Sequence, residues 1–395
     1  MKNRNFIIWS GSQFISILGN NFYAIALPWY IYSLTHSKES LAIIGFVLML
    51  PNVASLVSGA FVDRWPKRMV MLFLDAVRAI IVGLMFVAVE LPIDVWVLIG
   101  LVFLLELAGT AYYPVSSALL PLIVSDEVLP SAMGFSQSLT SSAQLMGMAS
   151  GGELITLLGT PILFLGDAIS FALSTLSMLW LQVTERIVLN KSTVWREIYE
   201  GFSYLRKSQM FLYILAIGTF INFLLAPLEI SFTLYVKDVL HKTSTWLGLI
   251  NGALVAGMIL GGLLSGSVQK KMSLKMILVI TLLLSGTFIF AGGTWISGSV
   301  MIVSIGLYGV VLGIANASLN TTYVRLTPER LRGRIFGLIS TVMLISAPLG
   351  MIAFGFAIQQ VRITFVYQVM GGLIWVAGGS FLVPIPDDTA VLSHD

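Results

Sequence analysis

Two carboxylic acids interrupt long apolar stretches of the chain. Glu106 lies about midway along residues 95–121, and Glu229 lies in the outer half of residues 210–236. An ionisable side chain at membrane depth costs about 2.5–3.5 kcal/mol on insertion scales. Desolvation favours the neutral form of such an acid, so it can exchange a proton near neutral pH. Both are candidates for proton coupling, Glu106 before Glu229, whose outer position favours constant hydration. The alternative for Glu106 is a structural acid hydrogen-bonded to a neighbouring helix.

Other charged groups in apolar stretches have simpler interpretations. Glu153 and Asp167 are expected near the outer ends of their helices, where water can reach them. Asp75 and Arg78 are three residues apart, so they can pair locally on one helix face.

Polar and aromatic residues also recur at helical spacing within apolar runs. Such a stripe faces protein or a cavity rather than lipid, and with aromatic and methionine side chains it suits a large amphipathic ligand. Neighbouring helices could equally satisfy the amides. The candidate cavity residues are Gln13, Asn20, Tyr23, Tyr30, Tyr113, Asn222, Asn316 and Asn320.

A short charged segment stands between two of the apolar runs. Only 10% of all residues are charged, yet four charged side chains occupy six positions of this segment. Such crowding is typical of a tight loop between two membrane helices. Its notable residues are Gly59, Asp63, Arg64, Lys67 and Arg68.

The composition requires membrane helices to position these residues. Soluble proteins carry about 25% charged residues, whereas this chain carries 10% and has a mean hydropathy of +0.93. A helix needs about 20 apolar residues to cross the hydrocarbon. The sequence predicts an all-α polytopic protein with twelve spans: 6–33, 41–62, 69–89, 95–121, 131–158, 161–183, 210–236, 246–267, 275–293, 297–324, 333–358 and 363–384.

Basic residues predict the orientation. With the N-terminus inside, 17 of the 22 Lys and Arg fall in cytoplasmic segments and four fall outside. Both termini are therefore expected in the cytoplasm. The apolar run after the N-terminus is too long for a signal peptide and is taken as an uncleaved first span.

The spans divide into two sets of six. We expect an N-terminal bundle (residues 1–183), a cytoplasmic linker with an amphipathic helix (residues 184–209) and a C-terminal bundle with a short tail (residues 210–395). A shift of 202 residues places Gly59 on Gly261 and Arg68 on Lys270. The same shift places Ser125 on Thr327, so the halves are read as parallel repeats with a substrate path between them.

The charged segment follows the spacing G-x-x-x-D-R-x-x-K-R. It resembles the loop between the second and third helices of the major facilitator superfamily. The chain departs from that pattern at Pro66, where the family usually has Gly, and at Lys67. The resemblance implies a solute transporter in which Asp63 interacts with the N-terminal end of span eleven and the basic residues hold the cytoplasmic gate shut. The alternative is that the basic residues only enforce topology.

Further stretches resemble the macrolide-efflux and enterobactin-exporter branch of that superfamily. They are Asn3–Phe6, Ala26–Trp29, Pro114–Pro121, Phe164–Phe171 and Leu331–Gly337. The resemblance covers nearly the whole chain and implies proton-driven export of amphipathic drugs, with antibiotic resistance as the consequence.

Two departures bear on the mechanism. Many relatives carry an acid in the middle of span one, where this chain has Asn20 and Asn21. The antiporter motif G-P-x-x-G-G is represented by Gly147, Gly151 and Gly152 without its proline. Close helix approach at these glycines is still expected.

Several function classes are disfavoured. The chain has no cysteine, its three histidines lie in loops or the tail, and it has no nucleotide-binding loop. We therefore expect no cofactor, no metal, no nucleic-acid partner and no enzyme activity. The expected partners are a small-molecule substrate, protons and the lipid bilayer, for a monomer in the bacterial plasma membrane. The alternatives are a dedicated metabolite or siderophore exporter of the same fold and, more remotely, a membrane-embedded lipid enzyme.

Overall fold

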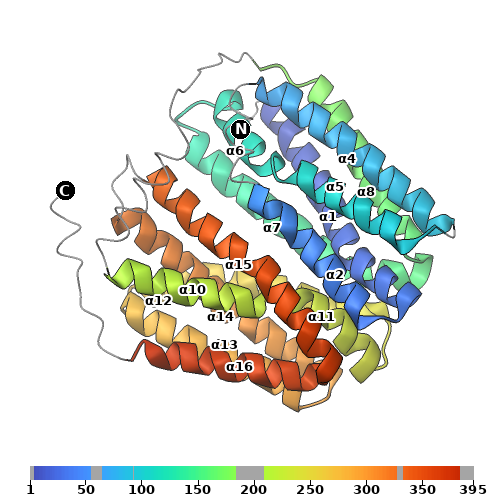
Figure 1. The fold of residues 1–395 in the computed structure, drawn as a ribbon. Coiled ribbons are helices and arrows are strands. Elements are labelled where there is room, and N and C mark those ends of the chain that lie inside the picture. Colours follow the sequence, from blue (N-terminus) through green and yellow to red (C-terminus); the bar gives the residue numbers. More distant parts are fainter. Residues whose placement is uncertain (1–3, 55–64, 92, 184–208, 327–331, 383–395) are drawn as a thin grey trace. The chain divides into compact units, whose positions relative to one another are not determined.

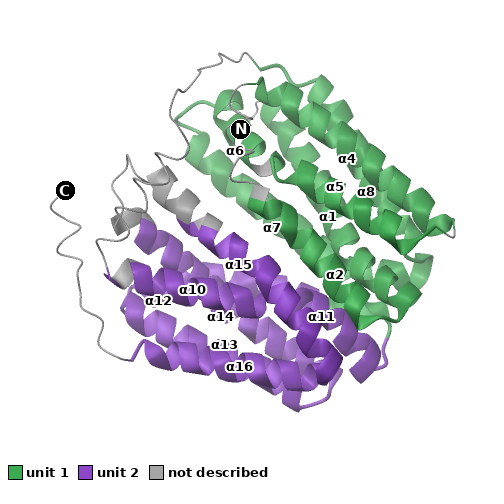
Figure 2. Cartoon of the chain, in the orientation of Figure 1, with its two compact units in different colours: residues 1–191, 243–249 green, residues 192–242, 250–395 purple. Residues whose placement is uncertain are grey.

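A computed structural model of the chain describes residues 4–54, 65–91, 93–183, 209–326 and 332–382. The described residues are helical, with no strand among them, and they form two compact units (Figures 1 and 2). Unit 1 comprises residues 1–191 and 243–249, and unit 2 comprises residues 192–242 and 250–395. The expected linker helix lies outside the described residues.

Unit 1 is built mainly from the N-terminal helices. They are α1 (Arg4–Thr35), α2 (Lys38–Met49), the 3₁₀ turn η1 (Leu50–Ala54), α4 (Lys67–Glu90), α5 (Val95–Gly109), α6 (Tyr112–Ile123), α7 (Leu129–Leu158) and α8 (Pro161–Leu179). Local signals mark several helix starts. Ser37 and Asp94 accept backbone N–H groups at the first turns of α2 and α5, and Pro161 opens α8.

Unit 2 continues the helical pattern to the C-terminus. Its elements are α10 (Gln209–Leu225), α11 (Leu228–Leu234), the π-helix η2 (Tyr235–Val239), α12 (Ser244–Gln269), α13 (Leu274–Thr294), α14 (Gly298–Leu326), α15 (Arg332–Gln360) and α16 (Ile363–Ser380). The first turns of α12, up to Leu249, belong to unit 1, so this helix contributes to both units.

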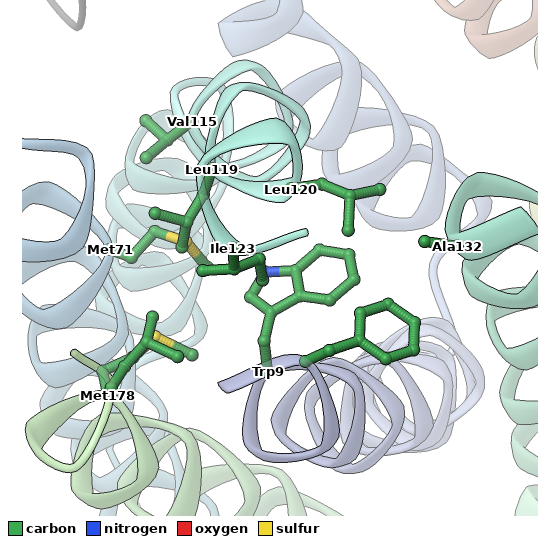
Figure 3. Packing of buried hydrophobic residues seen from close by; sticks show 10 residues of the cluster. Trp9, Met71, Val115, Leu119, Leu120, Ile123, Ala132 and Met178 are labelled. Atoms are coloured by element: carbon green, nitrogen blue, oxygen red, sulfur yellow. The ribbon is translucent and has the colours of Figure 1, made fainter. Parts of the chain in front are cut away.

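Each unit has its own apolar core. In unit 1 Phe6 and Trp9 of α1 pack with Met71 of α4, with one face of α6 and with Met178 of α8 (Figure 3). In unit 2 Ile214 and Leu215 of α10 pack with residues of α13, α14 and α15. The long helix pairs α4–α8 and α1–α8 dominate unit 1, and α13–α16 dominates unit 2.

Within the described residues, nine helical segments are long and apolar enough to cross a membrane. Three expected spans do not meet this criterion: 6–33, 41–62 and 131–158. The second runs into undescribed residues, while α1 and α7 are rich in polar and small residues. The count of twelve therefore stays a prediction.

Two expected spans are interrupted. Span 95–121 consists of α5 and α6, separated at Thr110 and Ala111. Span 210–236 consists of α10 and α11, separated at Ala226 and Pro227, and it continues as η2. Pro114 follows the first break and Pro227 lies in the second, and a proline cannot donate to the carbonyl four residues earlier.

Candidate functional site

Three charged side chains are buried inside unit 1. Asp75 and Asp167 are 0% exposed, and Arg78 is 5% exposed. Asp75 and Arg78 lie on α4, and Asp167 lies on α8, which packs along α4. A buried charge is tolerated only where partners replace its lost hydration, so the contacts of these three residues define the candidate site.

Arg78 has contacts on three sides. Its Nη1 lies 3.8 Å from Asp75 Oδ1, which confirms the predicted pairing within this helix. Its Nη2 donates to Asn20 Oδ1 of α1 at 3.0 Å. The guanidinium carbon lies 4.0 Å from the ring centroid of Phe171 and 4.9 Å from that of Tyr112. Aromatic faces stabilise a desolvated cation, so the guanidinium is held between two rings.

Hydroxyl groups support the two buried aspartates. Ser174 Oγ donates to Asp75 Oδ2 at 2.5 Å and lies 2.8 Å from Ser12 Oγ of α1. Ser170 Oγ lies 3.2 Å from Asp167 Oδ1 and also reaches the Asp167 carbonyl oxygen at 2.7 Å. Each aspartate therefore has one oxygen held by a serine of α8, one helical turn apart.

Gly19 of α1 allows this close packing. A Cβ atom at Gly19 would lie 2.6 Å from Asp167 Oδ1 and would also clash with Ser170 Oγ. Only glycine leaves room for α8 to bring Asp167 against the α1 backbone. Asp167 is thus fully enclosed between the two helices, although the sequence suggested a position that water can reach.

Glu106 lies at the edge of this cluster. It is half-buried in the last turn of α5, and its carbonyl accepts the N–H of Thr110 at 3.1 Å. The charge of Arg78 acts on Glu106 and on Asp167. Since the helix breaks after Gly109, helical spacing does not align Tyr113 with Glu106; the side chain of Tyr113 lies outside the described residues.

The polar stripe of α1 is satisfied largely inside unit 1. Gln13 Nε2 donates to the Tyr112 hydroxyl at 2.8 Å, and Asn20 accepts from Arg78. Tyr23 is buried, and Tyr30 donates to the carbonyl of Val89 at 3.3 Å. For Gln13 and Asn20, these contacts correspond to the alternative in which neighbouring helices satisfy the amides.

The candidates of unit 2 are more accessible. Glu229, Asn316 and Asn320 are exposed, and Asn222 is half-buried. Glu229 stands in the first turn of α11, while Asn222 lies on α10. The break between α10 and α11 separates them, so a spacing of seven residues does not by itself place them on one face.

The glycines of the antiporter-like motif are packing positions of α7. A Cβ at Gly147 would lie 2.6 Å from Asn21 Cβ of α1, and Gly151 faces Ile25 of the same helix. A Cβ at Gly152 would lie 2.7 Å from the backbone nitrogen of Gly248 in α12. The three glycines therefore permit α7 to approach two other helices closely.

Only part of the charged loop is described. Gly59, Asp63 and Arg64 lie outside the described residues. Lys67 begins α4, and Arg68 donates to two backbone carbonyls at the end of α8, those of Met178 at 2.9 Å and Leu179 at 2.7 Å. Arg68 thus adds donors for two carbonyls at the end of α8, of which that of Met178 also accepts the N–H of Leu181 at 3.3 Å.

The sequence did not indicate the centre of this site. Arg78 was assigned only to a local pair, Phe171 was noted only as the end of a stretch that resembles the exporter branch, and Ser174 was not singled out. The signal in the sequence that could have found the site was the presence of Asp75, Arg78 and Asp167 within apolar helices, because ionisable residues in such helices argue for function by default. No group of three or more metal-ligating side chains occurs among the described residues.

A set of long apolar helices around buried charged groups defines a polytopic membrane protein. A family profile described as the Major Facilitator Superfamily matches residues 9–351 and 228–391. The chain belongs to this superfamily of transporters. It is therefore a multi-pass protein of the bacterial plasma membrane with a small-molecule substrate.

Individual relatives support this assignment. Macrolide efflux protein A of Streptococcus pyogenes is 25% identical over 392 residues, covering 94% of each chain. The multidrug efflux pump Tap of Mycolicibacterium fortuitum is 26% identical over 361 residues, covering 85% of each chain. A mutant of the nucleoside transporter NupG has a similar crystal structure, with a TM-score of 0.78, 13% identity, and coverage of 96% of this chain and 99% of that one. This last likeness concerns the fold alone.

Proposed function

We propose that this protein exports amphipathic small molecules, macrolide-like or more varied drugs, by proton antiport with alternating access. The observation that carries the proposal is the similarity to macrolide efflux protein A along 94% of both chains. The relative named as a multidrug efflux pump supports a broader cargo. The fold and the relatives are those of transporters rather than enzymes.

Proton coupling is assigned first to Glu106. It is half-buried at the end of α5 and lies within electrostatic reach of Arg78, so its charge state depends on the same buried cation as that of Asp167. Glu229 is exposed, and no charged side chain among the described residues acts on it. It remains the second candidate for proton coupling.

Cargo contact is assigned to the accessible polar residues of unit 2. Asn316 and Asn320 are exposed on one face of α14, four residues apart. A polar side chain in an apolar membrane helix turns away from lipid. These two amides, with Asn222 and Glu229, are therefore proposed to face the transported molecule rather than the bilayer.

The charged loop is proposed to help close the cytoplasmic side. Asp63 and Arg64 would make the closing contacts, whereas Lys67 and Arg68 stand at the start of α4. The two hydrogen bonds of Arg68 to α8 give this residue a structural role as well.

The test measures transport by the variant Glu106→Gln in proteoliposomes with a radiolabelled macrolide. Glutamine keeps the size of glutamate and can still form hydrogen bonds, but it has no group that titrates near neutral pH. We expect uphill transport driven by a pH gradient to fall at least tenfold, while downhill exchange persists. Glu229→Gln, at matched protein level, is the paired variant.

The outcomes separate the two acids. If Glu106→Gln transports uphill at the wild-type rate and Glu229→Gln does not, the order of the acids is wrong. If both transport normally, neither acid carries the coupling proton. If the wild type moves no macrolide and gives no resistance in an efflux-deficient strain, the proposed cargo class is wrong.

A further inference from the structure

The buried cluster of unit 1 contains more acid than base. Among the described residues of this cluster, Arg78 is the one cation. The groups that face it come from five helices: Asn20 and Tyr23 on α1, Asp75 on α4, Glu106 on α5, Tyr112 on α6, and Asp167, Ser170, Phe171 and Ser174 on α8. One guanidinium neutralises one carboxylate. Because Asp75 and Asp167 are both fully buried, the second of them must be neutralised by a proton.

The atoms that lack hydrogen bonds complement one another. Among the described residues, Arg78 leaves two donors without an acceptor, Nε and Nη1. Asp75 leaves Oδ1 and Asp167 leaves Oδ2 without a donor. A long arginine side chain can satisfy its free donors by pairing more closely with either acid. Leaving such groups unpaired is costly. The free donors and acceptors therefore favour a second arrangement of the same side chains, in which they are paired with one another.

The two acids are held in similar surroundings. Ser174 supports one oxygen of Asp75 and Ser170 supports one oxygen of Asp167, and both serines lie on α8. Ser170 Oγ also reaches the Asp167 carbonyl oxygen at 2.7 Å. Each carboxyl group therefore has a hydroxyl group beside one of its oxygens, and a hydroxyl group can donate to an ionised acid or accept from a protonated one. Neither acid is committed by its hydrogen bonds to be the protonated one.

We propose that Asp75 and Asp167 share a single proton and that Arg78 pairs with whichever of the two is ionised. In both states the three residues carry no net charge, so the exchange avoids an isolated buried charge. One O–H bond breaks at one carboxyl group and one forms at the other, with water admitted to the site as the carrier. Arg78 stays protonated throughout. The inference rests on the proposed proton antiport, for which it supplies a second, internal proton-holding site beside Glu106.

A fixed arrangement is the competing explanation. In it Asp75 and Arg78 form a permanent ion pair, and Asp167 is always the protonated acid. The two explanations differ in what happens when Asp75 loses its charge. With a shared proton, Arg78 turns to Asp167, which then gives up its proton. With fixed roles, Asp167 keeps its proton.

Infrared spectroscopy of the purified protein in lipid at neutral pH separates these explanations. The carbonyl stretch of a protonated buried carboxyl group is counted in the Glu106→Gln background, so that Glu106 does not contribute. Other acids cancel in difference spectra. We expect Asp75→Asn and Asp167→Asn each to remove the same single protonated carboxyl group. Arg78→Gln should add a second one, because neither acid then has a counter-charge.

Retention of the protonated carboxyl signal in Asp75→Asn would overturn the proposal. Asparagine is nearly isosteric with aspartate, and monodisperse elution with an unchanged helical circular dichroism spectrum checks that each variant folds. If Arg78→Gln does not fold, the two asparagine variants still decide the matter. The measurement needs no cargo, so a failure of the exporter assignment in transport assays leaves it interpretable. Conversely, export by the wild type together with fixed protonation would overturn the shared proton alone.

Discussion

At the scale of single residues, Arg68 shows how one cation of a charged loop can stabilise a helix end. Its guanidinium donates through Nε to the carbonyl of Met178 and through Nη2 to that of Leu179. Carbonyls in the last turn of a helix have no partner within the helix, and a cation there also complements the helix dipole. The planar fork of arginine serves both carbonyls at once, which an ammonium group does not match.

We predict that Arg68→Lys lowers the stability of the folded protein although the charge, and with it the topology, is kept. The loss of one hydrogen bond from a charged donor to the half-exposed end of α8 lowers the free energy of unfolding by about 1 kcal/mol. The measurement is the unfolding temperature in detergent, followed by fluorescence-detected size exclusion. Lys270→Arg is the matched control, because Lys270 is exposed and stands at the position equivalent to Arg68 in the second half. Equal effects of the two exchanges would contradict a specific role of Arg68.

The buried cluster shows what a sequence can and cannot predict at this scale. The pairing of Asp75 with Arg78 followed from a spacing of three residues, and the structure confirms it. The bond from Arg78 to Asn20 joins residues 58 positions apart. The chain carries no local signal for such a contact, because it depends on how α1 and α4 pack against α8. The same packing encloses Asp167, which the sequence placed nearer to water.

At the scale of elements, glycines set the distance between α12 and α14 in unit 2. Gly257 and Gly261 of α12 lie against Gly309 and Gly313 of α14. A Cβ at Gly309 would lie 3.2 Å from Gly257 Cα, and one at Gly313 would lie 3.1 Å from Gly261 Cα. Each helix thus carries two glycines four residues apart, the spacing that lets membrane helices meet backbone to backbone.

We predict that Gly261→Ala destabilises unit 2, whereas Gly262→Ala does not. A Cβ at Gly261 would clash with the carbonyl of Val310, and backbone cannot move aside as a flexible side chain would. Overpacking of this kind costs about 1–3 kcal/mol. At Gly262 nothing lies within 4 Å, so alanine adds only helix propensity there. Thermal unfolding of the two variants, which differ by one position on the same helix, measures the difference; equal melting temperatures would contradict the close contact.

Prolines explain why the element boundaries were only partly predictable. Pro28, Pro121 and Pro348 lie inside continuous helices. Pro227, in contrast, lies in the break between α10 and α11, and Pro114 follows the break between α5 and α6. In each case proline removes the same backbone donor. Whether the helix bends or ends depends on neighbouring helices that cover the loosened backbone, and this information is not local in the sequence.

At the scale of the whole molecule, the two halves that the sequence predicts differ in the charges of their apolar helices. The offset of 202 residues places apolar side chains opposite the three buried charged residues: Ile277 for Asp75, Ile280 for Arg78 and Val369 for Asp167. Asn20 in contrast falls on Asn222. At this offset an amide stands on the first helix of each predicted half, whereas the buried ionic groups among the described residues lie in the first half. We expect proton handling to belong to unit 1 and cargo contact to draw on unit 2.

The membrane topology is predicted from the distribution of basic residues along the whole chain. With twelve spans and the N-terminus inside, 17 basic residues fall inside and four outside, and this bias predicts that both termini are cytoplasmic and that the loop around Lys38 is outside. Because the chain has no cysteine, single cysteines can be introduced and labelled with a membrane-impermeant maleimide without any background. We expect Glu39→Cys, at an exposed position beside Lys38, to react in intact cells. Lys191→Cys and Ser393→Cys, both outside the described residues, should react only after permeabilisation. Labelling of either one in intact cells would mean that a predicted span does not cross the membrane, and that the two halves do not share one orientation.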